Sequence, residues 1–262
     1  MAREVNVSFI GAGNVAWHLA PALDNVGYVV KEVYSRHPKN AEALTGRLYQ
    51  AEVKATLDFS TSPSSLFILC VSDDALKDMV REIILPDDAF LIHTSGSQPL
   101  SELQYSATPH IGVLYPLQTF TKAKQIDFKD VPIFIESSDI ETETLLLKIG
   151  KSISQQVRKI TSHERKALHV AAVFASNFTN HMITLSEKVM VDNGLKFEWL
   201  KPLILETIQK SLAIGPQRAQ TGPAVRGDLE ILDQHIAFLQ DDETTAELYR
   251  VISQHILDRY HE

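Results

Sequence analysis

The residues best suited to chemistry stand near the amino terminus, in the run Gly11-Ala12-Gly13-Asn14-Val15-Ala16. An apolar stretch at 5–10 precedes this run, and apolar residues recur behind it at helical spacing. In a strand–turn–helix of this kind the first glycine permits the tight bend, and the second lets a pyrophosphate approach the backbone. The start of the helix offers unpaired N–H groups to phosphates. The sequence therefore predicts a dinucleotide-binding turn made by Gly11, Ala12, Gly13, Asn14 and Val15.

A second candidate group, Ser35-Arg36, follows the next predicted strand at 29–34. In this fold NAD-binding proteins place an acidic residue near the end of that strand, whereas NADP-binding proteins place an arginine there. Glu32 has a suitable separation from the turn but lies inside the predicted strand. A guanidinium matches a 2′-phosphate through forked hydrogen bonds, so Ser35 and Arg36 favour NADP. The alternative interpretation of Arg36 is an ordinary solvated surface arginine.

Polar residues also follow two further predicted strands. Ser72-Asp73-Asp74 comes after the apolar run 66–71, and Thr94-Ser95-Gly96-Ser97 comes after 89–93. Because the carboxyl ends of parallel strands meet at one edge of a sheet, these clusters and Ser35-Arg36 should converge on one crevice. Cys70, the only cysteine, stands inside its apolar run and is interpreted as a small core residue.

The elements that must position these residues change character along the chain. Strands predicted at 5–10, 29–34, 66–71, 89–93, 110–114 and 131–135 alternate with helical patterns, which indicates an α/β, doubly wound, mostly parallel sheet of Rossmann type. From residue 158 onward the pattern is helical. We therefore predict a dinucleotide-binding Rossmann domain at 1–157 and an all-helical substrate and dimerisation domain at 158–262.

The helical part opens with a capping box, Thr161-Ser162-His163-Glu164, and its first helix should run to Asn193-Gly194. Apolar residues on nearly every side predict that the first half of this helix, 167–175, is buried. His169 and Asn177 fall near one another on a polar face. They are expected either to line the substrate end of the crevice or to hydrogen-bond to a neighbouring helix or second subunit. Helices are also predicted at 198–214, 228–239 and 243–260, with Asp228 as an N-cap.

Composition limits the classes of function. The chain has 262 residues, a net charge of −8, one cysteine and no apolar run of membrane-spanning length. An acidic chain is a poor partner for nucleic acid, and a single cysteine suits a reducing compartment. The sequence begins directly with a predicted strand, so we expect a soluble, cytoplasmic protein. The ten histidines form no His-Glu-x-x-His pair, so no metal site is predicted.

With these residues in hand, the chain resembles the Rossmann-like NADP oxidoreductases that carry an all-helical C-terminal domain. The stretches that carry the resemblance run from end to end: Gly11–Ala16, Ser35-Arg36, His93–Ser97, Tyr115–Phe120, His169–Asn177 and Thr221–Asp228. The layout is more distantly similar to pyrroline-5-carboxylate reductase, 3-hydroxyisobutyrate dehydrogenase and ketopantoate reductase. The resemblance implies a helical domain like the C-terminal domain of 6-phosphogluconate dehydrogenase.

The resemblance also implies a function. The protein would bind NADP(H) and transfer hydride to or from a small carbonyl, imine or hydroxy substrate bound between the two domains. It would form a homodimer through the helical domain. It places Cys70, Val71, Ser72, Thr94 and Ser95 along the path from adenosine to nicotinamide.

One departure concerns the long helix. Related hydroxyacid dehydrogenases have a lysine four residues before an asparagine; if Asn177 is that asparagine, Val173 occupies the lysine position. His169 is then the first candidate to exchange a proton, because an imidazole titrates near neutral pH. Ser95, Tyr115 and Asn177 would polarise or position the substrate. His93 and His110 are alternative donors, but each falls in a strand pattern typical of a core histidine.

Two functions remain open. The first is an NADP(H)-dependent oxidoreductase acting on a small molecule. The second is a non-catalytic NADP(H)-binding sensor or regulatory protein, since the fold does not determine the function.

Overall fold

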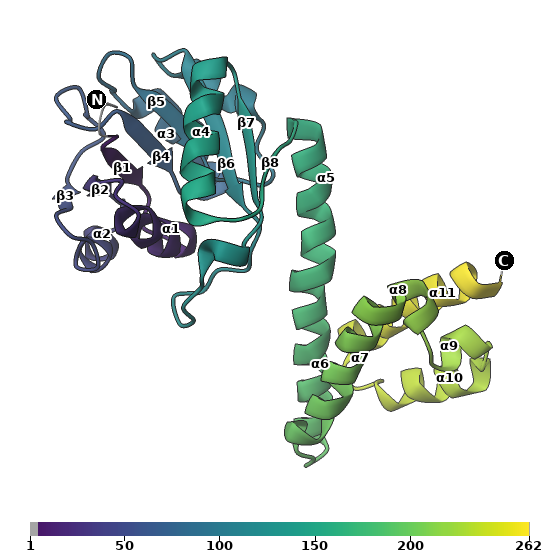
Figure 1. Ribbon diagram of the computed structural model, residues 1–262. Coiled ribbons are helices and arrows are strands. Elements are labelled where there is room, and N and C mark those ends of the chain that lie inside the picture. Colours follow the sequence, from purple (N-terminus) through teal and green to yellow (C-terminus); the bar gives the residue numbers. More distant parts are fainter. Residues whose placement is uncertain (1–4, 262) are drawn as a thin grey trace. The chain divides into compact units, whose positions relative to one another are not determined.

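A computed structural model describes residues 5–261 of the chain (Figure 1). The packing divides the chain into two compact units, with the division between Ser176 and Asn177. Within the described residues, all the strands lie in the first unit, and the second unit contains helices only. Among the described residues no helix is long and apolar enough to cross a membrane.

The first unit is built on one eight-stranded sheet with the order β3-β2-β1-β4-β5-β6-β7-β8. The pairing of β6 with β7 is antiparallel, and the other neighbours are parallel. This confirms the predicted doubly wound α/β fold. The strands are β1 (Val7–Ile10), β2 (Val30–Tyr34), β3 (Glu52–Lys54), β4 (Leu66–Leu69), β5 (Phe90–His93), β6 (His110–Pro116), β7 (Ile133–Ser137) and β8 (Val157–Lys159).

Two hydrophobic clusters cover the two faces of the sheet. Successive residues of a strand point to opposite faces, so Phe9 enters one cluster and Ile10 the other. Because both faces of β4 are covered, all four of its residues are buried, as its continuous apolar run predicted. The helices of this unit are α1 (Asn14–Asn25), α2 (Pro38–Thr45), α3 (Asp73–Glu82), η1 (Leu100–Tyr105), η2 (Phe128–Asp130), α4 (Ile140–Ile153) and α5 (Ser162–Ala172).

The long helix begins as predicted and differs in its middle. Thr161 and Glu164 form a reciprocal capping box at the start of α5. A π-helical turn, η3 (Val173–Phe178), then separates α5 from α6 (Thr179–Asp192). The helix ends at Asn193-Gly194, where Gly194 has a φ of +68°. The prediction of a buried first half is wrong: Arg165 is the only buried residue of α5, and Phe174 is 63% exposed.

The second unit contains the remaining helices. They are η4 (Phe197–Leu200), α7 (Lys201–Ile214), α8 (Pro216–Ala219), α9 (Pro223–Arg226), α10 (Leu229–Phe238) and α11 (Glu243–His261). Asp228 precedes α10 as predicted, but its carboxylate makes no capping hydrogen bond and instead accepts one from Arg226 Nε at 2.8 Å. The segment between the helices predicted at 198–214 and 228–239 contains the short helices α8 and α9.

Two short strands, β3 and β8, were not predicted. Each has three residues at an edge of the sheet, with little apolar sequence of its own. The domain boundary predicted at 157 marks the change in sequence pattern. The boundary between the two compact units lies further along the chain, after residue 176, so α5 belongs to the same unit as the sheet. Arg165 links α5 to the sheet, because its guanidinium hydrogen-bonds to Ser95, Gln98 and Glu136.

Candidate functional site

The glycine turn follows β1 directly and requires its first glycine. Gly11 has a φ of +103°, and a Cβ there would lie 2.3 Å from the carbonyl oxygen of Cys70. Neither the backbone angle nor the space admits another residue. Gly13 is exposed and is the N-cap of α1, whose first turn carries no acidic side chain. Ala16 is fully buried, which fits a small third residue that lets helix and strand pack closely.

The other predicted residues of the turn differ in exposure. Ala12 is buried, Val15 is half-buried and Asn14 is exposed at the start of α1. The unpaired N–H groups of the helix start therefore face an open surface at the carboxyl end of β1, which is the arrangement that binds phosphates.

Ser35 and Arg36 lie at the end of β2, as the sequence indicated. Ser35 Oγ accepts a hydrogen bond from the backbone N–H of His37 at 3.2 Å, and Arg36 is exposed. Glu32 is engaged inside the unit: its carboxylate accepts hydrogen bonds from Ser8 and Ser62 and pairs with Lys54 at 3.3 Å. Its side chain is therefore held by these groups, whereas Arg36 presents a free cation to solvent in the described part of the chain.

The residues after β4 include the single cysteine. Burial raises the pKa of the Cys70 thiol to about 12, so it stays protonated, and Thr94 Oγ1 lies 3.7 Å from its sulfur. Cys70 is thus a core residue that could contribute only backbone to the crevice. Val71 is half-buried, and Ser72 is exposed as the N-cap of α3.

The loop after β5 is fixed by the carboxylate of Asp73, which belongs to the polar cluster predicted at 72–74. Ser95 Oγ donates to Asp73 Oδ1 at 2.6 Å, and Ser97 Oγ donates to Asp73 Oδ2. Ser95 Oγ also accepts from the N–H groups of Ser97 and Gln98 at 3.1 and 3.0 Å. The place of Asp73, directly after a buried strand and at the start of a helix, was the available signal. Ser95 is therefore held in a tight hydrogen-bonded turn.

Tyr115 and His169 form a pair beside this turn. The hydroxyl of Tyr115, in β6, lies 3.1 Å from Nδ1 of His169, in α5, and the two rings meet edge to face. Gly96 lies against both: a Cβ there would be 2.5 Å from His169 Nδ1 and 2.7 Å from Tyr115 Cζ. Burial raises the pKa of the Tyr115 hydroxyl above its ordinary value, and the charge of Arg165 offsets part of that rise.

Three of the four predicted catalytic residues thus come together in the first unit: Ser95, Tyr115 and His169. Asn177 is the first residue of the second unit and is exposed in the π-helical turn. Val173, at the position where related dehydrogenases have a lysine, begins the same turn. π-helical turns occur frequently at functional sites.

Arg165 is the most unexpected residue of the site. Its side chain is fully buried, and Nη1 donates to the carbonyl oxygens of Ser95 and Gln98 at 2.9 and 2.7 Å. Nη2 pairs with Glu136 at 3.0 Å. The guanidinium therefore joins the β5 loop to α5, one turn before His169. A charged residue four positions before His169 shares its helix face, and this spacing was the signal in the sequence.

The alternative histidines are poorly placed for catalysis. His93 is fully buried, and desolvation lowers its pKa to about 3, so it is neutral; its Nδ1 accepts from the N–H of Ser95 at 3.1 Å. His110 stands at the opposite, amino end of β6 and faces Asp139 at 3.5 Å. Among residues 5–261 no three His, Cys, Asp or Glu side chains gather as a metal site would require.

The parallel sheet, the glycine turn and the polar strand ends define a domain of Rossmann class, followed by a helical C-terminal region. Family models agree: a Rossmann-like domain matches residues 2–110, and a domain of unknown function, DUF2520, matches residues 131–256. No curated protein sequence matches the chain.

Solved structures extend this likeness over the whole chain. A Bacteroides fragilis protein proposed to be an NADP oxidoreductase is 37% identical, with a TM-score of 0.90 over 97% of this chain and 98% of its own. The chain therefore belongs to the same family as this protein, and it combines a Rossmann-like domain with a DUF2520 domain.

Two more distant structures share the fold. A reductive aminase from Aspergillus terreus, bound to NADPH and ethyl-5-oxohexanoate, is 16% identical with a TM-score of 0.70, covering 96% of this chain and 92% of its own. Pyrroline carboxylate reductase from Plasmodium falciparum, bound to NADP, is 15% identical with a TM-score of 0.60, covering 97% and 98%.

Proposed function

We propose that this protein is an NADP(H)-dependent oxidoreductase that acts on a small carbonyl, imine or hydroxy compound at the carboxyl ends of β5 and β6. The observation that carries the proposal is the Tyr115–His169 pair, held against Gly96 beside the loop that follows β5. NADP(H), when bound, supplies or accepts the hydride, so the protein must orient the reactants and exchange one proton.

The residues present fit the dinucleotide. The Gly11 bend leaves no room for a side chain, and Gly13 exposes the start of α1 to a pyrophosphate. Arg36, at the end of β2, would hold the 2′-phosphate, with Ser35 beside it. Backbone at Cys70–Ser72 and Thr94 would line the path toward the nicotinamide.

In the proposed reaction Tyr115 hands a proton to the substrate oxygen or nitrogen during reduction. Its raised pKa keeps the phenol protonated at neutral pH. His169 then returns a proton to Tyr115 through the 3.1 Å contact between the hydroxyl and Nδ1. Ser95 acts indirectly, since its hydroxyl is engaged by Asp73 and shapes the turn.

Turnover is tested by following NADPH oxidation at 340 nm. The panel should hold ketoacids, aldehydes, cyclic imines, and ketones supplied with an amine, since the distant relatives are a reductive aminase and a pyrroline carboxylate reductase. With an active substrate, Tyr115→Phe should lower kcat by about 10²–10⁴-fold, the range for removing a general acid. NADPH affinity should stay unchanged.

The alternative is a sensor that binds NADP(H) without turnover. Tight NADPH binding with no reduction of any compound would favour the sensor and defeat the enzyme proposal. Turnover that Tyr115→Phe leaves intact would refute the proton path.

The choice of NADP over NAD is tested by Arg36→Ala. Loss of a charge-assisted phosphate contact, worth about 1.5–3 kcal/mol, should weaken NADPH by roughly 10- to 100-fold and leave NADH nearly unaffected. Lys39→Ala, an exposed cation three residues along, is the matched control and should have a small effect on both. Equal weakening of NADPH and NADH by Arg36→Ala would refute the 2′-phosphate assignment.

We place the protein in the cytoplasm, where thiols stay reduced. Its single cysteine, Cys70, is buried and unpaired, so the fold needs no oxidising compartment.

A further inference from the structure

Three separate segments of the first unit bring two cations to one tryptophan ring. Trp17 lies in α1, and its side chain is half-buried. The guanidinium carbon of Arg47, just after α2, lies 4.2 Å from the centre of the ring, and Arg47 Nη1 donates to the carbonyl oxygen of Trp17. Lys122 Nζ, from the segment 117–127 that follows β6, lies 4.8 Å from the same ring. The two cations are therefore no more than about 9 Å apart.

The segment that carries Lys122 is fixed to α1. Most of this segment is exposed, but the ring of Phe120 packs against those of His18 and Phe128, with ring centres 5.5 and 5.9 Å away. His18 is buried in α1, and its Nε2 donates to the carbonyl oxygen of Thr121 at 2.9 Å. The backbone is thus held one residue before Lys122, which places the ammonium group over α1.

No carboxylate neutralises these two cations. Arg47 and Lys122 are exposed, and neither forms an ion pair within the described part of the chain. Asp24, the only acid of α1, accepts hydrogen bonds from backbone N–H groups. Asp127, the only acid of the segment 117–127, is the N-cap of η2. The nearest acids in these two elements are therefore engaged by the backbone.

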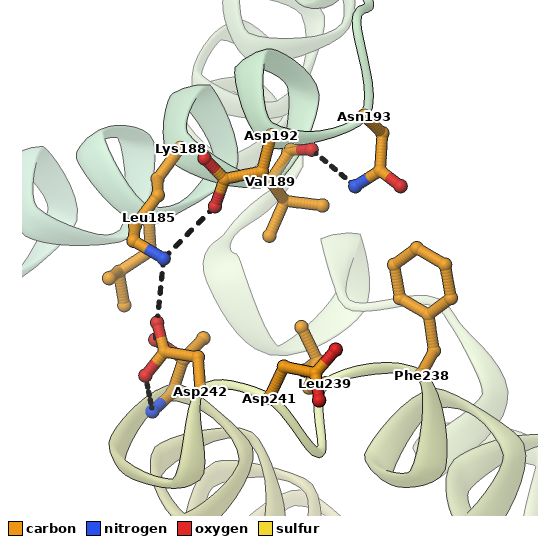
Figure 2. Close-up of a pocket in the computed structure, with 10 residues that line it drawn as sticks. Leu185, Lys188, Val189, Asp192, Asn193, Phe238, Leu239, Asp241 and Asp242 are labelled. Carbon is orange, nitrogen blue, oxygen red and sulfur yellow. Dashed lines mark hydrogen bonds and ion pairs between the residues drawn. The ribbon is translucent and has the colours of Figure 1, made fainter.

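A lysine of the second unit shows the opposite arrangement. In the hollow drawn in Figure 2, Lys188 donates to Asp192 at 3.0 Å and to Asp242 at 2.9 Å, so two carboxylates offset its charge. The indole of Trp17 attracts a cation through the negative face of its ring but carries no net charge. It therefore gathers two cations and leaves both charges available. Because like charges this close repel each other, a bound anion would be favoured there.

We propose that Arg47 and Lys122 bind a phosphate group beside Trp17, either orthophosphate or the phosphate of a small ester. A phosphate carries up to two negative charges and three strong acceptor oxygens, which matches two cations. The guanidinium donates through its planar fork and the ammonium acts as a point charge. Charge-assisted N–H···O bonds span about 2.8 Å, so one phosphate can accept from both. A carboxylate carries a single charge and would neutralise only one of them.

Trp17 can report on its own site by fluorescence. The chain has two tryptophans, and Trp199→Phe leaves Trp17 as the only one. In this full-length background inorganic phosphate should give a saturable change with a Kd on the order of 1 mM, and sodium chloride at equal ionic strength should not. Arg47→Ala and Lys122→Ala should each weaken phosphate about 10-fold. Lys124→Ala removes an exposed cation of the same segment and is the matched control, with unchanged affinity expected.

Thermal unfolding gives a second measurement that needs no tryptophan signal. Millimolar phosphate should raise Tm of the wild-type chain, and the combined Arg47→Ala and Lys122→Ala variant should lose that rise. Glycerol 3-phosphate separates the two sources of the ligand. Tighter binding than inorganic phosphate would assign the site to a phosphate ester, and equal or weaker binding would assign it to orthophosphate.

Two results would overturn the proposal. One is a fluorescence change that chloride reproduces, or a phosphate affinity that both alanine variants retain. The other is loss of phosphate binding when NADP⁺ is present at saturation, which would place the phosphate in the site proposed for the dinucleotide. No substrate turnover is measured, so the result is independent of the proposed catalysis.

Discussion

His93 should make the stability of the folded protein depend on pH. The imidazole is fully buried at the end of β5, and desolvation lowers its pKa to about 3, whereas an unfolded histidine titrates near 6.5. As the pH falls through 6.5, His93 binds a proton in the unfolded chain but stays neutral in the folded chain. The contribution of His93 is therefore complete above about pH 6.5 and is lost progressively down to about pH 3.

The magnitude follows from the separation of the two pKa values. Between pH 7 and pH 5 a single site with these values lowers the free energy of unfolding by about 2 kcal/mol. His93→Asn removes the titration, while its side-chain oxygen can still accept the hydrogen bond that Ser95 N–H gives to Nδ1.

The assay is urea unfolding of the full chain at pH 5, 6 and 7, with and without His93→Asn. Carboxylates titrate equally in both proteins, so the difference between their pH slopes isolates His93. The wild-type chain should lose about 2 kcal/mol more than the variant. Parallel slopes would mean that the imidazole binds its proton over the same pH range in the folded and unfolded states, and the exclusion of His93 as a proton donor would fail with it.

Three further outcomes are expected. Gly11→Ala should cost on the order of 3 kcal/mol of stability, because Gly11 has a positive φ and its added Cβ would clash with Cys70. Gly13→Ala should fold normally and bind NADPH weakly. Urea denaturation measures the first effect, and titration with NADPH measures the second. Gly96→Ala should separate the Tyr115–His169 pair and lower kcat, so an unchanged kcat would contradict the pairing. Arg165→Met should cost about 3–5 kcal/mol by leaving Glu136 unpaired, and adding Glu136→Gln should restore part of that loss in urea unfolding.

Local patterns in the sequence determined most of the first unit. The alternation of apolar runs and amphipathic stretches specified the doubly wound sheet, because burial on both faces demands continuous apolar strands. The strand–turn–helix at Gly11 and the capping box at Thr161 could also be predicted from the sequence, since each depends on residues a few positions apart. The same patterns could not predict β3 and β8. Each of these strands has only three residues and is stabilised by pairing with a neighbouring strand.

The long helix shows where local pattern fails. Its apolar residues predicted burial. Hydrophobicity indicates that a surface favours being covered, but it does not identify the element or molecule that covers it. In the structure Val170 and Phe174 are exposed, so the apolar pattern alone gave the wrong burial for this segment.

By itself, then, the sequence determined the fold class, the glycine turn and the residue types available for chemistry. Only the tertiary structure decided which of them meet: Tyr115 and His169 are 54 positions apart, and Arg165 reaches Ser95 across 70. The physical reason is that a hydrogen bond or ion pair between distant residues depends on how the sheet and α5 pack. That packing depends on the contacts of the whole core, so no single segment of the sequence determines it.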